Sequence, residues 1–236
     1  MYLRSVELLK NKRSSTHHYP FSIPAIRTLD KLAFTRNITF FVGENGSGKS
    51  TLLEAIAYQC GFNPAGGGRN NVYDVDAAEA ALGEYLRLSW LPKMTNGFFL
   101  RAESFYHFAS HIDEVNAQQY YGGRSLHEQS HGESFLSLFL HRFNRTGIFL
   151  LDEPEAALSP TRQLSFLRIL RDLEPTSQFI IATHSPIILG YPDAQIVHFD
   201  QDGIREVHYE DTEHYQITRR FLENRKAILR ELFEDE

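Results

Sequence analysis

One short segment constrains this chain more than any other. Residues 43–50 run Gly-Glu-Asn-Gly-Ser-Gly-Lys-Ser and match the Gly-x-x-x-x-Gly-Lys-Ser phosphate loop at every fixed position. In such a loop the glycines let backbone N–H groups converge on a phosphate, and Lys49 places a positive charge beside the β- and γ-phosphates. The hydroxyl of Ser50 can ligate Mg²⁺. The segment therefore predicts ATP or a related triphosphate as ligand, with Mg²⁺ as cofactor.

The flanking residues favour the same interpretation. Residues 38–42, Ile-Thr-Phe-Phe-Val, form a β-branched and aromatic run that is typical of a buried strand. Residues 50–57 then open a helix whose N-terminus faces the phosphates. A glycine-rich surface turn is the alternative, and it explains neither the strand before this segment nor the helix after it. The expected nucleotide-binding residues are Gly43, Glu44, Asn45, Gly46, Ser47, Gly48, Lys49, Ser50 and Thr51.

Two further strand ends carry residues that suit phosphate chemistry. Residues 148–153, Ile-Phe-Leu-Leu-Asp-Glu, have the form of a Walker B strand, with Asp152 expected to hold Mg²⁺ through water. Glu153 is expected to orient and polarise the attacking water. His184 follows the apolar run 179–182, and we expect its imidazole to bond the γ-phosphate and to help fix Glu153. For Asp152 and Glu153 the alternative is an ordinary acidic loop after a buried strand, which the presence of the phosphate loop disfavours.

Apolar patterning predicts alternating strands and helices, and hence an α/β sheet with its ligand at the strand C-termini. The expected strands are residues 2–9, 32–34, 38–42, 97–102, 148–151 and 179–182, with a hairpin over 195–207. The expected helices are residues 50–57, 164–173 and an amphipathic C-terminal helix carrying Ile217, Phe221, Ile228, Leu229 and Leu232.

Composition bounds the class of protein. With 236 residues, 42% of them hydrophobic and 23% charged, the chain can bury one substantial core, so we expect a single domain over residues 1–236. No run reaches the length of about 20 apolar residues that spans a bilayer, and the N-terminus lacks the apolar core of a signal peptide. A single cysteine, Cys60, fits a reducing cytoplasm. The net charge of −6 gives little support to nucleic-acid binding.

Taken in order along the chain, these motifs resemble the ABC-type ATPase family. The resemblance covers most of residues 1–200 and consists of the phosphate loop, the region of Glu103, residues 129–133 (Gln-Ser-His-Gly-Glu), Asp152-Glu153 and His184. It implies an α/β P-loop NTPase of ABC-ATPase type. The expected architecture is a mixed sheet core with an antiparallel β subdomain and a small helical subdomain near residues 103–145.

The resemblance also implies further site residues. Ser130 and Gly132 match the small residues of the family signature, which contact the γ-phosphate of the opposite subunit, with His131 and Glu133 as departures. Glu103 replaces a glutamine that approaches Mg²⁺ or its water, and Ser159 replaces an aspartate. An aromatic residue stacks on adenine in many members, and Tyr19 is the first candidate here. Phe21 is the next, and a packed aromatic is an equal alternative for either.

The implied activity is Mg-dependent ATP binding and hydrolysis by a homodimer that forms head to tail around ATP. Two settings stay open: a soluble SMC/RecF-like ATPase acting with a protein partner, or the ATP-binding subunit of a transporter with separate membrane subunits. Glu103 and Ser159 favour the first, because they depart from the transporter pattern. A nucleotide sensor without turnover is disfavoured because Lys49, Asp152, Glu153 and His184 are all present.

One competing motif overlaps the signature. Residues 127–131 spell His-Glu-x-x-His, the pattern of zinc proteases, in which both histidines ligate the metal from one helical face. Gly132 weakens continuation of such a helix, and the nearest downstream ligand, His141, has the wrong spacing. The ATPase signature accounts for the same residues without zinc.

Overall fold

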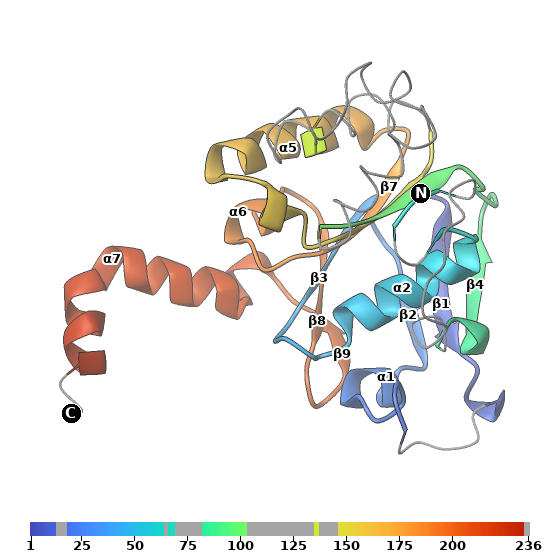
Figure 1. Ribbon diagram of the computed structural model, residues 1–236, viewed down its shortest axis with the longest axis horizontal. Coiled ribbons are helices and arrows are strands. Elements are labelled where there is room, and N and C mark those ends of the chain that lie inside the picture. Colours follow the sequence, from blue (N-terminus) through green and yellow to red (C-terminus); the bar gives the residue numbers. More distant parts are fainter. Residues whose placement is uncertain (13–17, 64–65, 69–81, 103–134, 137–145, 234–236) are drawn as a thin grey trace, which may run out of the picture.

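The computed structural model describes residues 1–12, 18–63, 66–68, 82–102, 135–136 and 146–233. In this part of the chain a six-stranded sheet has the order β5-β6-β7-β3-β8-β9, parallel throughout except for β9 (Figure 1). The bounds are β3 (Ile38–Val42), β5 (Gly97–Arg101), β6 (Ile148–Asp152), β7 (Gln178–Ala182), β8 (Gln195–Phe199) and β9 (Ile204–Glu206). The mixed sheet of the expected fold is confirmed.

The strand order brings the predicted motifs to one edge. β7 lies between β6 and β3, with Ala182 paired to Asp152 on one side and to Phe41 on the other. The phosphate loop leaves β3 and leads into α2 (Lys49–Cys60), whereas Asp152 ends β6 and His184 follows β7. Because parallel strands end at the same edge, residues more than 100 positions apart in sequence meet there.

Alternate residues of the parallel strands enter two different cores. Phe41, Leu150 and Ile180 are fully buried against α2 and the smaller sheet. Phe40, Leu151 and Ile181 are fully buried on the opposite face, which α5 (Pro160–Leu173) and α6 (Pro186–Leu189) cover. Helices on both faces explain why these strands are continuous apolar runs rather than alternating ones.

A three-stranded antiparallel sheet, with the order β2-β1-β4, confirms the expected antiparallel subdomain. One link to the larger sheet is a buried glutamine: Gln178 Oε1 accepts from the backbone N–H groups of Tyr2 and Leu3, both at 2.8 Å, and Gln178 Nε2 donates to Leu3 O at 2.9 Å. The bounds are β1 (Leu3–Leu8), β2 (Lys31–Ala33) and β4 (Leu86–Trp90), with α1 (Pro24–Thr28) beside them.

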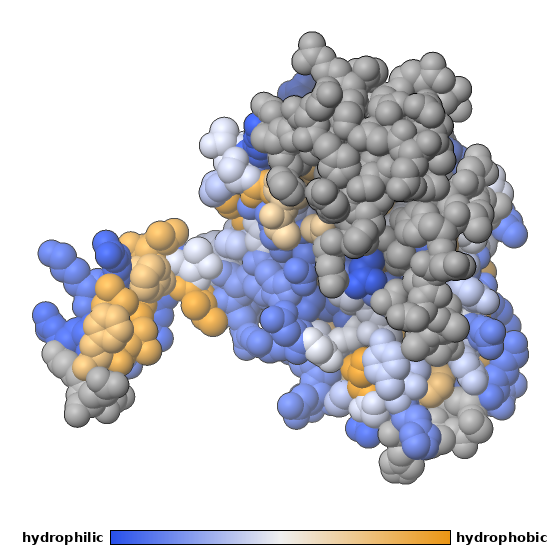
Figure 2. All heavy atoms as spheres, in the orientation of Figure 1, coloured by the Kyte–Doolittle hydropathy of each residue, from blue (hydrophilic) through white to orange (hydrophobic). Residues whose placement is uncertain are grey.

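The C-terminal helix α7 (Glu213–Phe233) confirms the expected amphipathic helix but projects away from the body (Figure 1). It bends at Asn224, whose backbone leaves helical geometry. Several of its apolar side chains are exposed, including Ile217, Leu222 and Phe233. Figure 2 shows a hydrophobic patch on this projecting arm. Within the described residues, we find no helix with the length and apolar character needed to cross a membrane.

Some elements differ from the sequence expectations. β4, α1 and α6 were not predicted, and α5 begins at Pro160 rather than at residue 164. The expected helical subdomain, residues 103–145, lies outside the described residues apart from positions 135–136. The described residues also form short 3-10 helices, namely η1 (Lys10–Lys12), η2 (Gly83–Tyr85), η5 (Pro154–Ala157) and η6 (Tyr209–Asp211).

Candidate functional site

The phosphate loop has a backbone shape that needs glycine. Gly43 has a φ of 140°, and a Cβ placed on it would lie 2.2 Å from the carbonyl oxygen of Phe199. Gly48 has a φ of 102° directly before α2. Both angles lie where L side chains are strained, so the glycines let the loop curl tightly against β8 and present its N–H groups. This is the concave shape that an anion requires.

Lys49 lies buried over this loop. Its Nζ donates to Gly43 O at 2.7 Å and to Glu44 O at 2.9 Å. Burial lowers the pKa of Lys49, whereas the charges of Glu153 and Asp152 oppose that shift. An ammonium has three N–H donors, so these bonds leave one for a phosphate oxygen. Ser47 Oγ is a second suitable group, since this buried hydroxyl has no hydrogen-bond partner among the described residues.

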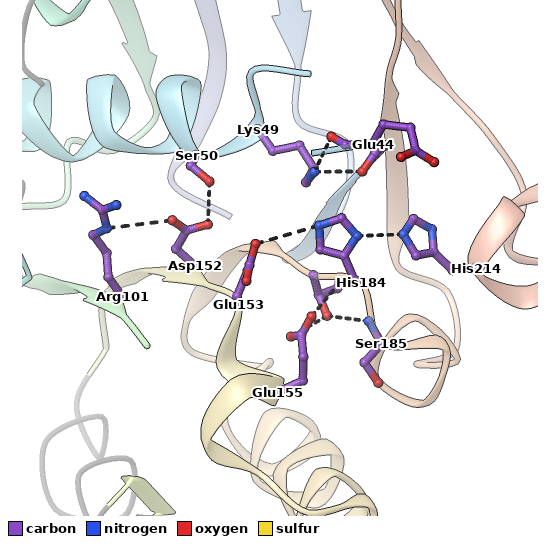
Figure 3. A network of polar contacts seen from close by, with 12 residues as sticks. Glu44, Lys49, Ser50, Arg101, Asp152, Glu153, Glu155, His184, Ser185 and His214 are labelled. Carbon is purple, nitrogen blue, oxygen red and sulfur yellow. Dashed lines mark hydrogen bonds and ion pairs between the residues drawn. The ribbon is translucent and has the colours of Figure 1, made fainter. Parts of the chain in front are cut away.

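Ser50 and Asp152 form the most direct contact between the two motifs. Ser50 Oγ donates to Asp152 Oδ1 at 3.0 Å, although 102 residues separate them (Figure 3). Desolvation raises the pKa of Asp152 to about 6, against the Ser50 hydrogen bond and the nearby charge of Arg101. Arg101 lies 3.9 Å from this carboxylate and pairs with buried Glu54 at 3.0 Å. A hydroxyl and a carboxylate oxygen at this separation fit Mg²⁺, which prefers oxygen ligands.

Glu153 stands on a strained backbone. Its φ of 50° and ψ of 52° are left-handed, a conformation that costs on the order of 1–3 kcal/mol for a residue other than glycine. Its N–H donates to Ala182 O at 2.9 Å, which ties the turn to β7. The side chain is 48% exposed, and its Oε1 lies 3.7 Å from His184 Nε2. The turn therefore presents a solvent-accessible carboxylate beside the histidine and the phosphate loop (Figure 3).

His184 is held from two directions. Its backbone N–H donates to Glu155 Oε1 at 2.5 Å, and the neighbouring Thr183 hydroxyl donates to Glu155 Oε2 at 2.7 Å. Its ring nitrogen Nδ1 lies 2.9 Å from Nε2 of His214, in the first turn of α7. Sequence reasoning missed both partners. Glu155 was not among the expected site residues, and no sequence signal points to His214.

The other predicted residues are distributed as follows. Tyr19 is 56% exposed, and its hydroxyl lies 3.4 Å from Thr51 Oγ1 at the start of α2. Phe21 is buried and packs edge-on against Tyr85 with ring centroids 5.0 Å apart, which favours a core role. Ser159 directly precedes α5. Glu103, Ser130, Gly132 and the zinc-protease pattern of residues 127–131 lie outside the described residues.

The buried charge of Asp152 predicts a stability effect. We expect Asp152→Asn to raise the free energy of unfolding of the nucleotide-free protein by about 3 kcal/mol at pH 7.5, because the neutral amide avoids the desolvation cost. The folded pKa of about 6 lies above the unfolded value of 3.8, so the wild-type protein loses this stability as pH rises from about 4 to about 6.

Urea denaturation at pH 4, 5, 6 and 7.5 measures this difference. The free energies of unfolding of the wild-type and Asp152→Asn proteins should converge at pH 4 and differ clearly by pH 6. Asp172→Asn, an exposed aspartate paired with Arg168, is the matched control and should show no such divergence. An Asp152→Asn variant that is less stable than wild type at pH 7.5 contradicts the expectation.

Comparison with known proteins gives two partial family matches. Residues 120–190 match the model described as "AAA domain, putative AbiEii toxin, Type IV TA system", and residues 22–96 match a model described as an AAA domain. The two segments contain the phosphate loop, Asp152, Glu153 and His184. None of the curated proteins compared with this chain matches it.

Solved structures show the fold more completely. The ATP-binding cassette MJ1267 of an ABC transporter is 17% identical with a TM-score of 0.52, over 97% of this chain and 98% of that one. CbiO1 of Clostridium perfringens, part of the ABC transporter complex CbiONQ, is 19% identical with a TM-score of 0.51, over 99% of both chains. An SMC head domain from Thermotoga maritima is 17% identical with a TM-score of 0.49, over 88% of this chain and 99% of that one.

The two cassettes cover nearly the whole chain at TM-scores above 0.5. The chain therefore has the fold of an ABC-type ATPase domain within the P-loop NTPases, as its motifs predicted. At identities below 20%, this likeness describes the fold and not the process in which the protein takes part.

Proposed function

We propose that this protein binds ATP with Mg²⁺ and hydrolyses it to ADP and phosphate. The observation that carries the proposal is the 3.0 Å contact between Ser50 Oγ and Asp152 Oδ1. It joins the first turn of α2, beside the phosphate loop, to the strand end from which Glu153 projects. Binding groups for phosphate and metal and a carboxylate for chemistry thus share one edge of the sheet.

Each residue has a role that follows from its position. The loop N–H groups and Lys49 bind the β- and γ-phosphates at the positive end of α2. Ser50 and Asp152 hold Mg²⁺, which supplies charge neutralisation on the phosphate oxygens. Glu153 orients a water whose oxygen attacks the γ-phosphorus, and the bond to the bridging oxygen breaks. The bridging oxygen leaves with ADP, and the water proton passes to Glu153 and then to solvent.

The metal role of Ser50 can be tested by binding alone. We expect Ser50→Ala to keep ATP affinity in EDTA but to lose the gain in affinity that Mg²⁺ gives the wild-type protein, by about 10-fold or more. Titration calorimetry with and without Mg²⁺ measures both values. Ser165→Ala, on the exposed surface of α5, is the matched serine control. Wild-type Mg²⁺ dependence in Ser50→Ala would remove Ser50 from the metal site.

We further propose that the working form is a head-to-tail homodimer with two Mg·ATP at its interface. Support comes from the resemblance of residues 130–133 to the family signature, with Ser130 and Gly132 facing the γ-phosphate bound by the other subunit. Glu103 is proposed to approach the metal, and Tyr19 to contact the adenine beside Thr51. Hydrolysis removes the phosphate that bridges the subunits, so the dimer opens.

The dimer predicts a specific behaviour for a signature variant. Ser130→Arg should bind ATP as a monomer, because Ser130 serves the opposite active site. It should not dimerise, because the bulk and charge of arginine obstruct the interface. Size exclusion with light scattering in a Glu153→Gln background measures this, with Ser165→Ala in the same background as control. A normal ATP-dependent dimer places Ser130 elsewhere.

The setting we favour is a cytoplasmic ATPase, one domain over residues 1–236, that acts with a protein partner. The match of residues 120–190 to a family described by a toxin–antitoxin system supports this setting, as do Glu103 and Ser159 at positions where the transporter pattern differs. The alternative is the ATP-binding subunit of a transporter, which the two cassettes with this fold keep open. ATP turnover that requires liposomes and a membrane subunit would favour the transporter alternative. Stimulation of turnover by DNA with a steep salt dependence would favour nucleic acid as the partner.

A further inference from the structure

A second histidine reaches the active edge from α7. His214 Nε2 lies 2.9 Å from His184 Nδ1, and the two ring centroids are 5.0 Å apart. Burial, and then the proximity of His184, lowers the pKa of His214, which favours the neutral ring. The other nitrogen of the His184 ring, Nε2, is buried, has no hydrogen-bond partner among the described residues and faces Glu153 Oε1 at 3.7 Å.

The separation of the two ring nitrogens allows one hydrogen between them. A neutral imidazole has one N–H donor and one acceptor nitrogen. When both rings are neutral, either His214 Nε2–H donates to His184 Nδ1, which leaves the His184 proton on Nε2, or His184 Nδ1–H donates to His214. The second arrangement turns the lone pair of His184 Nε2 toward the Glu153 carboxylate and leaves no N–H for a phosphate oxygen. The first arrangement turns the Nε2–H of His184 toward the Glu153 carboxylate and toward a phosphate oxygen. It is therefore the favoured one.

We infer that His214 is a positioning residue that fixes His184 in the tautomer with its proton on Nε2, aimed at Glu153 and the γ-phosphate. The inference rests on the proposed ATP hydrolysis for its catalytic meaning. Glu155 supports the same arrangement by holding the backbone N–H of His184 at 2.5 Å. The carboxylate fixes where the histidine stands on its loop, and His214 fixes which of its ring nitrogens donates. A second group that sets the tautomer of a functional histidine is a general device.

The tautomer is measured without any nucleotide. In the full-length protein labelled with ¹⁵N-histidine, the ring nitrogens of His184, assigned by comparison with His184→Gln, should show a protonated Nε2 and an unprotonated Nδ1 at pH 8. His214→Leu removes the donor and should shift His184 to a mixture of tautomers. His214→Gln places an amide N–H near the former Nε2 and should restore the wild-type pattern. His208→Leu, at an exposed histidine before η6, is the control and should change nothing.

Steady-state kinetics of the same variants supply the catalytic readout. His214→Leu should lower kcat about 10-fold with KM for ATP little changed, because the misplaced proton weakens a bond made in the transition state. His214→Gln should recover most of this loss. A merely structural role predicts equal losses in the leucine and glutamine variants with the tautomer unchanged, and that result overturns the inference.

The two readouts separate this inference from the proposed function. If ATP is hydrolysed and neither the tautomer nor kcat responds to His214→Leu, the positioning role is wrong and the ATPase stands. If the tautomer depends on His214 but the wild-type protein has no ATPase activity, the positioning contact stands and the proposed function falls.

Discussion

Lys49→Ala is expected to lose ATP binding, with affinity falling at least about 100-fold. Removing one member of a close, buried charge pair costs about 3–5 kcal/mol, and each 1.4 kcal/mol is a tenfold change in affinity. Lys49 lies over the loop with its Nζ bonded to Gly43 O and Glu44 O. Residues 43–50 contain no other lysine or arginine, so no cation on the loop replaces it. Titration calorimetry with Mg·ATP measures the loss.

The variant should fold normally, which separates lost binding from lost structure. Burial lowers the pKa of Lys49, so replacing its ammonium removes a desolvation cost, and thermal unfolding without nucleotide should occur at an unchanged or higher temperature. Lys10→Ala is the matched control, because Lys10 is exposed and pairs with Asp30 at 3.3 Å on the surface. Wild-type ATP affinity in folded Lys49→Ala would refute the phosphate-loop assignment.

Glu153→Gln is expected to lower kcat by about 10²–10⁴ while ATP still binds. Glutamine keeps the size and a polar group but cannot accept the water proton, so the step after binding fails. The left-handed backbone at this position costs glutamine as much as glutamate, and the fold should not change. The bound ATP should persist and hold a dimer, seen by size exclusion with light scattering.

Glu210→Gln, at an exposed glutamate in η6, is the matched control. It should keep wild-type turnover and should be monomeric once its ATP has been hydrolysed. Should Glu153→Gln hydrolyse ATP at the wild-type rate, another group positions the water. Should it bind ATP tightly without dimerising, the head-to-tail arrangement fails while the catalytic role of Glu153 stands.

The local parts of the site were predictable from sequence because their signals are local. The phosphate loop is a contiguous motif in which Gly43 and Gly48 supply backbone angles that other residues resist. β6 and β7 are fully buried five-residue strands, so their apolar runs predict both strands and place Asp152 and His184 at the strand ends. These strand ends are adjacent because of the strand order. The ordered motifs of one family imply that order, whereas hydrophobic periodicity alone does not.

The missed contacts depend on tertiary placement. His214 meets His184 across 30 residues because α7 begins beside the active edge, and nothing in its own segment marks it. β4 pairs with β1, about 80 residues away, through a short half-exposed segment, Leu86–Trp90, without a strong apolar run. α7 shows the converse limit: its sequence identifies an apolar face, but amphipathicity does not say what covers it, and Ile217 and Leu222 are exposed.

Steady-state phosphate release by the wild-type protein, purified without detergent and assayed with ATP and Mg²⁺, tests ATP hydrolysis at this site most directly. We expect turnover that stops in EDTA and falls about 10²–10⁴ in Glu153→Gln, with Glu210→Gln at the wild-type rate. Either the absence of phosphate release from folded protein that binds Mg·ATP, or release that Glu153→Gln leaves unchanged, would contradict it.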